Sequence, residues 1–110
     1  MAESLDALKA DFFRSMAHPA RIRILELLVV ADRSVTELLP AVGLEATNLS
    51  QQLTVLRRAG IVSASRRGNA VTYSIASAHV AELLAVARAV LSSRLDEQAD
   101  ALGIPSADIP

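Results

Sequence analysis

A run of amide and hydroxyl side chains in the middle of the chain carries the clearest chemical signal. Thr47, Asn48, Ser50, Gln51 and Gln52 are short, polar and uncharged, and they share one side of a segment with helical spacing. Asn and Gln can pair bidentately with adenine, while Thr and Ser can reach a base or a phosphate. A helix that only has to be soluble would favour Lys and Glu. The pattern therefore predicts a helix that lies in the major groove of DNA, with a merely polar surface helix as the alternative.

Positive charge is concentrated in the same part of the chain. The whole chain has a net charge of −1, but residues 46–81 contain no Asp or Glu. A stretch that carries only basic groups attracts the phosphates of nucleic acid, although an ordinary solvated face would also fit. The basic groups of this stretch are Arg57, Arg58, Arg66 and Arg67.

A tight hairpin turn is predicted at Gly68 and Asn69, because β-branched, alternating segments flank them. Arg66 and Arg67 lie beside this turn, where we expect them to contact phosphates or the minor groove. Arg57 lies near a helix C-terminus, where the helix dipole also favours positive charge. It therefore fits either a phosphate contact or a structural role.

The third of five predicted helices shows the strongest local signals. Ser34 and Glu37 have the spacing of a capping box, and Gly43 supplies the left-handed turn that ends a helix. Pro40 removes a helical hydrogen bond, so we expect this helix to be short or distorted.

Apolar spacing, together with Pro, Gly and capping residues, sets the other boundaries. The layout of helix, glycine turn, helix and basic hairpin predicts a mainly α fold with a small β-hairpin wing, a winged helix-turn-helix. We expect this domain over residues 1–95 and a flexible tail over residues 96–110. The predicted helices begin near residues 4, 19, 35, 45 and 78 and end near 16, 30–32, 42, 59 and 95, and the predicted strands are 61–62 and 71–75.

Three stretches resemble the ArsR/SmtB family of bacterial winged-helix repressors: HPARIRILELL, VGLEATNLSQQLTVLRRAGIV and RRGNAVTYSI. The likeness covers roughly residues 5–95 and is most specific over Leu49–Val62. The resemblance implies a homodimer on a partly palindromic operator, from which it dissociates when an inducer binds. It also implies that the polar residues of the fourth helix face the DNA and that Arg66, Arg67 and Asn69 lie in the wing.

The first and last helices carry more apolar surface than one small core needs, which predicts a homodimer. In the last helix, one stripe should face its own domain and another the partner. Burial of these side chains contributes roughly 1.5–3 kcal/mol each. The side chains expected at the interface are Leu5, Leu8, Phe12, Val80, Leu83, Leu84, Ala87, Val90 and Leu91.

The residues with which the resembled family binds metals are replaced in this chain. One family site is the cysteine motif L-C-V-C-[DE]-L, where this chain has Ser34 and Thr36, and it contains no Cys. Hydroxyls are weak ligands for soft ions. In a second family site only one of four positions, His79, keeps a ligand, and a lone His cannot hold zinc. We therefore predict no metal site and no cofactor, and the inducer stays unknown. The four aligned positions are Ser77, His79, Val90 and Ser93.

Other classes of protein fit less well. No catalytic spacing of Ser, His and acidic residues is recognisable, so we do not expect an enzyme. A protein-docking winged helix is the alternative function, but such a face would expose aromatic or aliphatic anchors. No apolar run is long enough for a membrane span, and the N-terminus lacks the pattern of a secretion signal. We expect a cytoplasmic protein whose partners are double-stranded DNA and a second copy of itself.

Overall fold

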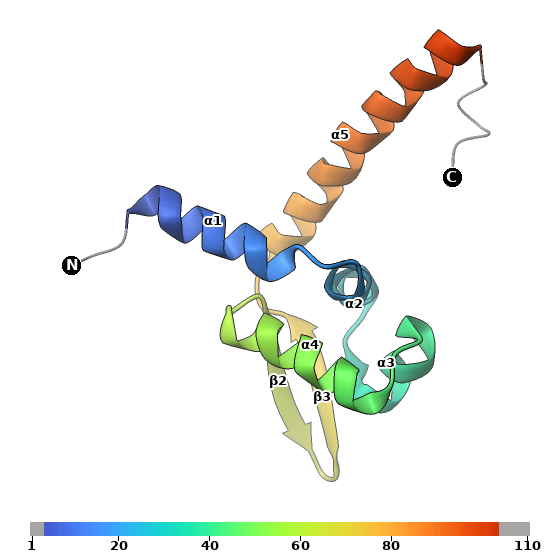
Figure 1. Ribbon diagram of the computed structural model, residues 1–110. Coiled ribbons are helices and arrows are strands. Elements are labelled where there is room, and N and C mark those ends of the chain that lie inside the picture. Colours follow the sequence, from blue (N-terminus) through green and yellow to red (C-terminus); the bar gives the residue numbers. More distant parts are fainter. Residues whose placement is uncertain (1–3, 104–110) are drawn as a thin grey trace.

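The computed structural model describes residues 4–103, which form five helices and a three-stranded antiparallel sheet. The elements are α1 (Leu5–Met16), α2 (Pro19–Val30), β1 (Arg33–Ser34), α3 (Val35–Val42), α4 (Ala46–Arg58), β2 (Val62–Arg67), β3 (Ala70–Ile75) and α5 (Ala78–Leu102). The helix-turn-helix of α3 and α4 is followed by the β2–β3 hairpin, so the predicted winged helix-turn-helix is confirmed (Figure 1). No helix of the described part is both long and apolar enough to cross a membrane.

Side chains just before α1 and α2 explain where these helices begin. The Ser4 hydroxyl accepts a hydrogen bond from the backbone N–H of Ala7 at 3.1 Å. Nδ1 of His18 accepts one from the N–H of Ala20 at 3.0 Å, and Pro19 takes the first position of α2. Proline suits that position because its missing N–H would have no helical partner there. Both N-caps thus satisfy donors that the helix itself leaves unpaired.

The predicted capping box is present at the start of α3. Oγ of Ser34 accepts a hydrogen bond from the N–H of Glu37 at 3.2 Å, and the Glu37 carboxylate accepts one from the N–H of Ser34 at 3.0 Å. The hydrogen bond from the Ser34 backbone is the main reason that the pKa of Glu37 lies below its ordinary value. The helix is short, as predicted, with Pro40 inside it. Gly43 ends the helix at a φ of +74°, where a side chain would be strained.

The hydrophobic core lies between α2, α3, α4 and the sheet. The helices α2 and α4 each contribute three buried leucines or isoleucines at helical spacing, and α3 contributes Leu38. The buried cluster also includes the end of α1 and the start of α5, which fixes both helices to the core at one end. Its members are Met16, Ile24, Leu25, Leu28, Leu38, Leu49, Leu53, Leu56, Ile61, Val62, Val80 and Leu84.

The sheet has the strand order β1-β3-β2. β2 and β3 pair antiparallel along their whole length and form the predicted wing. The sequence did not predict β1, because two residues are too few to show strand alternation. In β1, Arg33 pairs with Tyr73 and Ser34 with Thr72. This short strand therefore ties the connection between α2 and α3 to the wing.

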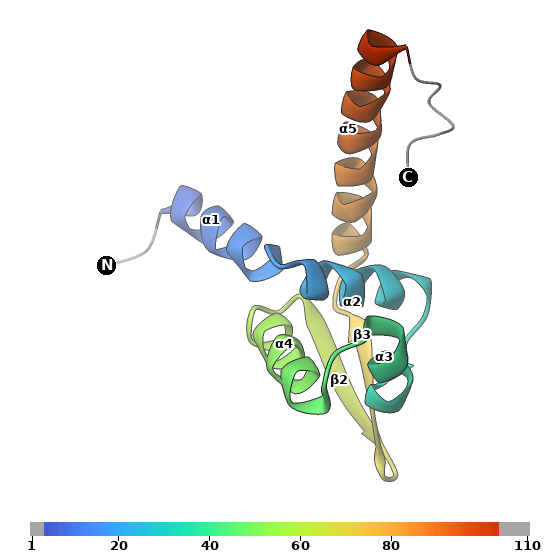
Figure 2. The ribbon, with the colours of Figure 1, turned by 45° about the vertical axis from the view of Figure 1, so that its right-hand side comes forward.

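The helices α1 and α5, which we call the arms, project from the body formed by α2 to β3. Both arms point away from the tip of the wing (Figures 1 and 2). The prediction that the last helix ends near Leu95 is wrong, and the first residues of the expected tail are helical. Instead, α5 continues to Leu102 and ends at Gly103, whose φ is +72°. Leu102 lies seven residues after Leu95 and continues the helical spacing. The rest of the expected tail, 104–110, lies outside the described residues.

Candidate nucleic-acid interface

The helix α4 has one buried side and one exposed side. Leu49, Leu53 and Leu56 are at most 1% exposed and hold the helix against the core. The polar residues that the sequence analysis assigned to DNA lie on the other side. Among them Thr47, Asn48, Ser50 and Gln51 are exposed, and Gln52 is half-buried.

A chain of hydrogen bonds connects this polar face with α2. Nη1 of Arg21 donates to Oε1 of Gln52 at 3.2 Å, and Nε2 of Gln52 donates to Oδ1 of Asn48 at 2.9 Å. The amide of Gln52 is thus engaged within the protein. Arg21 is not predicted from the sequence, because helical spacing shows which side Gln52 is on but not a partner 31 residues away.

The wing presents its basic tip to solvent. Arg66, Arg67 and Asn69 are exposed, and Gly68 turns the hairpin with a φ of +62°. The hairpin extends past α4 at the end of the molecule opposite to α5 (Figures 1 and 2). The polar helix and the basic tip therefore occupy the same end of the molecule.

The arginines of this surface keep their charge available. Arg57 and Arg58 lie in the last turn of α4 and are exposed. The ion pairs found within residues 4–103 are Arg14 with Asp11 and Arg88 with Glu26, so none involves the arginines of α4 or the wing. A guanidinium group without an acidic partner can form charge-assisted hydrogen bonds to phosphate.

Most of the large apolar side chains that are exposed to solvent lie on the arms. Eight of the eleven exposed large apolar side chains in the described part belong to α1 and α5. Such a surface is typical of a protein–protein contact. These eight are Leu5, Leu8, Phe13, Val86, Val90, Leu91, Leu95 and Leu102.

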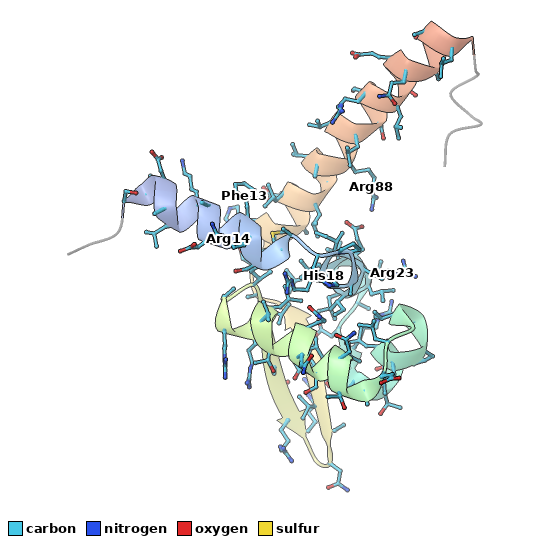
Figure 3. The ribbon with its side chains drawn as sticks, in the orientation of Figure 1. Phe13, Arg14, His18, Arg23 and Arg88 are labelled. Carbon is cyan, nitrogen blue, oxygen red and sulfur yellow. The ribbon has the colours of Figure 1, made fainter. Side chains whose placement is uncertain are left out.

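The other residues predicted at the dimer interface differ from one another in how far they are buried within their own chain. Val80 and Leu84 are only 6% and 7% exposed, because they pack into the core of their own chain. Phe12 and Leu83 are half-buried against that core, and Ala87 is exposed. Phe13 is not among the predicted interface residues, although it lies on the side of α1 that faces α5 (Figure 3). We accordingly leave Val80 and Leu84 out of the interface proposed below.

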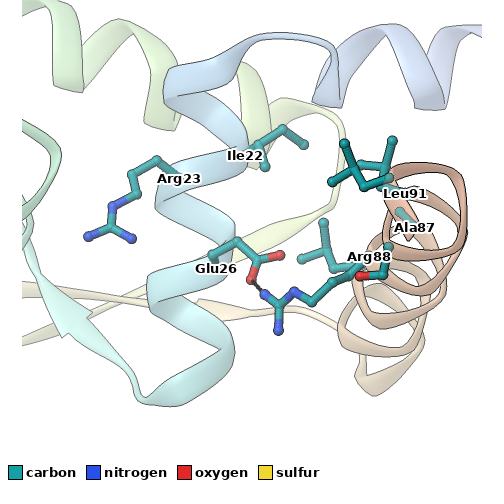
Figure 4. A pocket seen from close by; sticks show the side chains of 9 residues that line it. Ile22, Arg23, Glu26, Ala87, Arg88 and Leu91 are labelled. Carbon is teal, nitrogen blue, oxygen red and sulfur yellow. Dashed lines mark hydrogen bonds and ion pairs between the residues drawn. The ribbon is translucent and has the colours of Figure 1, made fainter. Parts of the chain in front are cut away.

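A groove separates α2 from α5 (Figure 4). Its walls include the apolar side chains of Ile22, Ala87 and Leu91, and an ion pair between Arg88 of α5 and Glu26 of α2 crosses it. The Arg88 side chain is 71% exposed, so this pair contributes at most about 1 kcal/mol. The ion pair joins one arm to the body without burying the apolar walls.

The buried leucines of the helix-turn-helix, the polar face of α4 and the basic wing define a winged helix-turn-helix DNA-binding protein. Residues 18–64 match the family described as bacterial regulatory protein, arsR family. The chain is 65% identical over 98 residues to the HTH-type transcriptional regulator Rv0081 of Mycobacterium tuberculosis, and the alignment covers 88% of this chain and 86% of that protein. The chain therefore belongs to the arsR family and is a helix-turn-helix transcriptional regulator. This class agrees with the prediction that it is not an enzyme.

Solved structures of related proteins share the fold. The crystal structure of Rv0081 superposes on this chain with a TM-score of 0.82, and the alignment covers 88% of this chain and 98% of the Rv0081 chain. The homodimeric winged helix-turn-helix DNA-binding domain of Mb0332 from Mycobacterium bovis is 31% identical, with a TM-score of 0.78 over 88% of this chain and 95% of that domain. The transcriptional repressor BigR from Xylella fastidiosa is 32% identical, with a TM-score of 0.72 over 77% and 87% of the two chains.

Two positions that align with the metal sites of the family serve as helix N-caps in this chain. Ser34 caps α3, as described above. Ser77 caps α5, because its Oγ accepts a hydrogen bond from the N–H of His79 at 3.1 Å, and it also lies 3.2 Å from Nδ1 of that residue. Within residues 4–103 no three His, Cys, Asp or Glu side chains gather in a way that could hold a metal ion.

Proposed function

We propose that this regulator is a homodimeric repressor that binds a partly palindromic operator through α4 and the wing. The observation that carries the proposal is the exposed, uncharged polar face of α4 beside arginines that have no acidic partner within residues 4–103. Amides and hydroxyls suit base edges, whereas arginines suit phosphates. The core of the protein requires neither feature.

Each part of the surface has its own role in this proposal. Asn48, Ser50 and Gln51 contact base edges in the major groove. Arg66 and Arg67 contact phosphates or the minor groove. Two symmetry-related copies of α4 then meet half-sites about one helical turn, or a multiple of it, apart. The remaining members of the surface are Thr47, Gln52, Arg57 and Asn69.

The arms supply the dimer interface in this proposal. The apolar side chains exposed on α1 and α5 support a contact with a second copy, and the related Mb0332 domain is a homodimer. The proposed contact includes Leu5, Leu8, Phe12, Leu83, Ala87, Val90 and Leu91 from the sequence analysis, together with Phe13 and Val86 from the structure.

The proposal that the chain represses transcription rests on relatives that are named as repressors. BigR is a transcriptional repressor, and a Streptomyces lividans relative that is 34% identical is a probable mercury resistance operon repressor. The inducer of this chain is not assigned. We expect operator affinity to stay unchanged in excess zinc, nickel, cadmium or arsenite, because the aligned metal positions offer one His in place of a full ligand set.

The proposal is tested first by selecting fragments of the source genome that the purified protein binds. A repressor should enrich a few fragments near promoters, with a shared, partly palindromic sequence. Enrichment without any shared sequence would contradict specific binding. Sedimentation at micromolar protein concentration tests the dimer, and a monomer alone would contradict it.

Two substitutions then test the surface on a selected operator. Gln51→Ala should weaken binding by about 1–3 kcal/mol and relax specificity at one position. Arg67→Ala should weaken binding to all sequences alike and lower the salt slope by about 1. Arg94→Ala, which removes the same charge from α5, is the control and should bind like the wild type. Unchanged binding by both test variants would rule out this surface.

A further inference from the structure

Arg21 reaches from α2 to the polar face of α4. The residue is half-buried, and its Nε is buried without a hydrogen-bond partner among residues 4–103, while its Nη1 donates to Gln52. A side chain that serves only as a phosphate contact would extend into solvent. Burying a donor that stays unsatisfied costs free energy, so such a group calls for an explanation beyond packing.

The chemistry of the guanidinium group fixes the direction of the hydrogen-bond chain. Arginine can only donate, so the Gln52 atom that faces it must be the acceptor Oε1. Nε2 of Gln52 is then directed to Asn48 and donates to its Oδ1 at 2.9 Å. Oδ1 of Asn48 is therefore turned toward the protein. Its Nδ2 has no acceptor among the described residues, and Asn48 is exposed.

We propose that Arg21 is a positioning residue that acts through Gln52 to hold the amide of Asn48 with its N–H groups toward the DNA. In this orientation Asn48 selects a base that presents an acceptor, such as O6 or N7 of guanine, over cytosine, which presents a donor there. The inference rests on the proposed function and adds to it the origin of specificity at one operator position.

Two substitutions change the chain of hydrogen bonds in different ways. Arg21→Met keeps a long apolar side chain but removes the donor that fixes Oε1 of Gln52. The side-chain amides of Gln52 and Asn48 can then flip, which exchanges their oxygen and nitrogen positions. Gln52→Glu keeps the acceptor for Arg21 but removes the donor to Asn48. The Asn48 amide must then direct its Nδ2 toward the new carboxylate and its Oδ1 toward the DNA.

The experiment measures binding by fluorescence anisotropy to operator duplexes in which each half-site position carries each of the four bases in turn. The wild type should prefer guanine over cytosine about fivefold or more at one position. Gln52→Glu should invert this ratio, and Arg21→Met should bring it close to one, with the other positions unchanged. Ratios are compared because the added carboxylate weakens binding to every duplex. Arg23→Met, an exposed arginine of the same helix, should keep the wild-type ratio.

A direct phosphate contact by Arg21 gives a different result. In that case Arg21→Met would weaken all duplexes equally and lower the salt slope by about 1, which would overturn the inference. Unchanged base preferences in both variants would also overturn it, while leaving specific binding intact. A wild type without any sequence-specific binding would contradict the proposed function itself. If circular dichroism shows that Arg21→Met is unfolded, the substitution Gln52→Glu at the half-buried partner decides alone.

Discussion

The body and the arms of this molecule differ in how completely one chain buries their apolar side chains. In the body, Leu25 and Leu38 are fully buried. In the arms, Leu5 is 65% and Leu102 is 73% exposed, although α1 and α5 show the same helical spacing of apolar residues. Apolar periodicity therefore predicts that a helix has an apolar side but not which molecule covers that side. The body completes its core with only the near ends of the arms, Met16, Val80 and Leu84, whereas the rest of each arm keeps large apolar side chains exposed.

A core deletion should show the largest difference between the two regions. Leu53→Ala in α4 removes a side chain that is 1% exposed and should lower the free energy of unfolding by about 2–5 kcal/mol. Leu8→Ala in α1 removes one that is 52% exposed and should change it by about 0.5 kcal/mol or less in the monomer. Urea unfolding at low protein concentration measures both. Equal losses would mean that Leu8 is part of the core.

A charged side chain introduced on an arm should weaken dimer association and leave the folding of the single chain intact. Leu91→Asp in α5 should raise the dimer dissociation constant about tenfold or more, since burial of one such side chain contributes roughly 1.5–3 kcal/mol. Sedimentation equilibrium measures this constant. Val30→Asp is the control, because Val30 is 76% exposed on the body. If both variants dissociate alike, the arms are not the interface.

The loss of stability caused by removing a helix cap should also differ between the body and the arms. Ser34→Ala removes the N-cap of α3 within the body and should lower the free energy of unfolding by about 1 kcal/mol. Ser4→Ala removes the N-cap of α1, and its effect should be smaller, because the first turn of an exposed arm can fray without opening the core. Thermal unfolding followed by circular dichroism compares the two, and the reverse order would contradict this account.

The smallest expected effect is the pH dependence that Glu37 gives to the body. Folding lowers the pKa of this carboxyl group, so its ionised form stabilises the native state. This contribution is fully present above the ordinary glutamate pKa of about 4.3 and disappears as the pH falls through the lowered value. The wild type should therefore be more stable than Glu37→Gln at pH 7, and the difference should shrink toward pH 3. A difference independent of pH would contradict the predicted role of the charge.

The sequence predicted most of the body because its signals are local. The capping box of Ser34 and Glu37, the end of α3 at Gly43 and the hairpin turn at Gly68 each depend on residues within four positions of one another. The fourth helix was recognised from the contrast between its leucines and its amides. These features are set by nearest neighbours along the chain.

The missed features depend on contacts between distant segments. The strand β1 exists because Arg33 and Ser34 pair with a strand almost forty residues later. Arg21 meets Gln52 only when α2 and α4 pack together. Neither pairing leaves a periodic pattern in the sequence. The end of α5 is a different case, because Gly103 was a visible stop signal that lay beyond the expected boundary.

Ser34 belongs to two structures at once, since it pairs with Thr72 of β3 and caps α3. A movement of the wing must therefore move the first turn of the helix-turn-helix as well. In the proposed complex this link helps to set the position of the wing relative to the helix-turn-helix before DNA is bound. DNA that must deform to match this position should bind less tightly, even at base pairs that no side chain contacts.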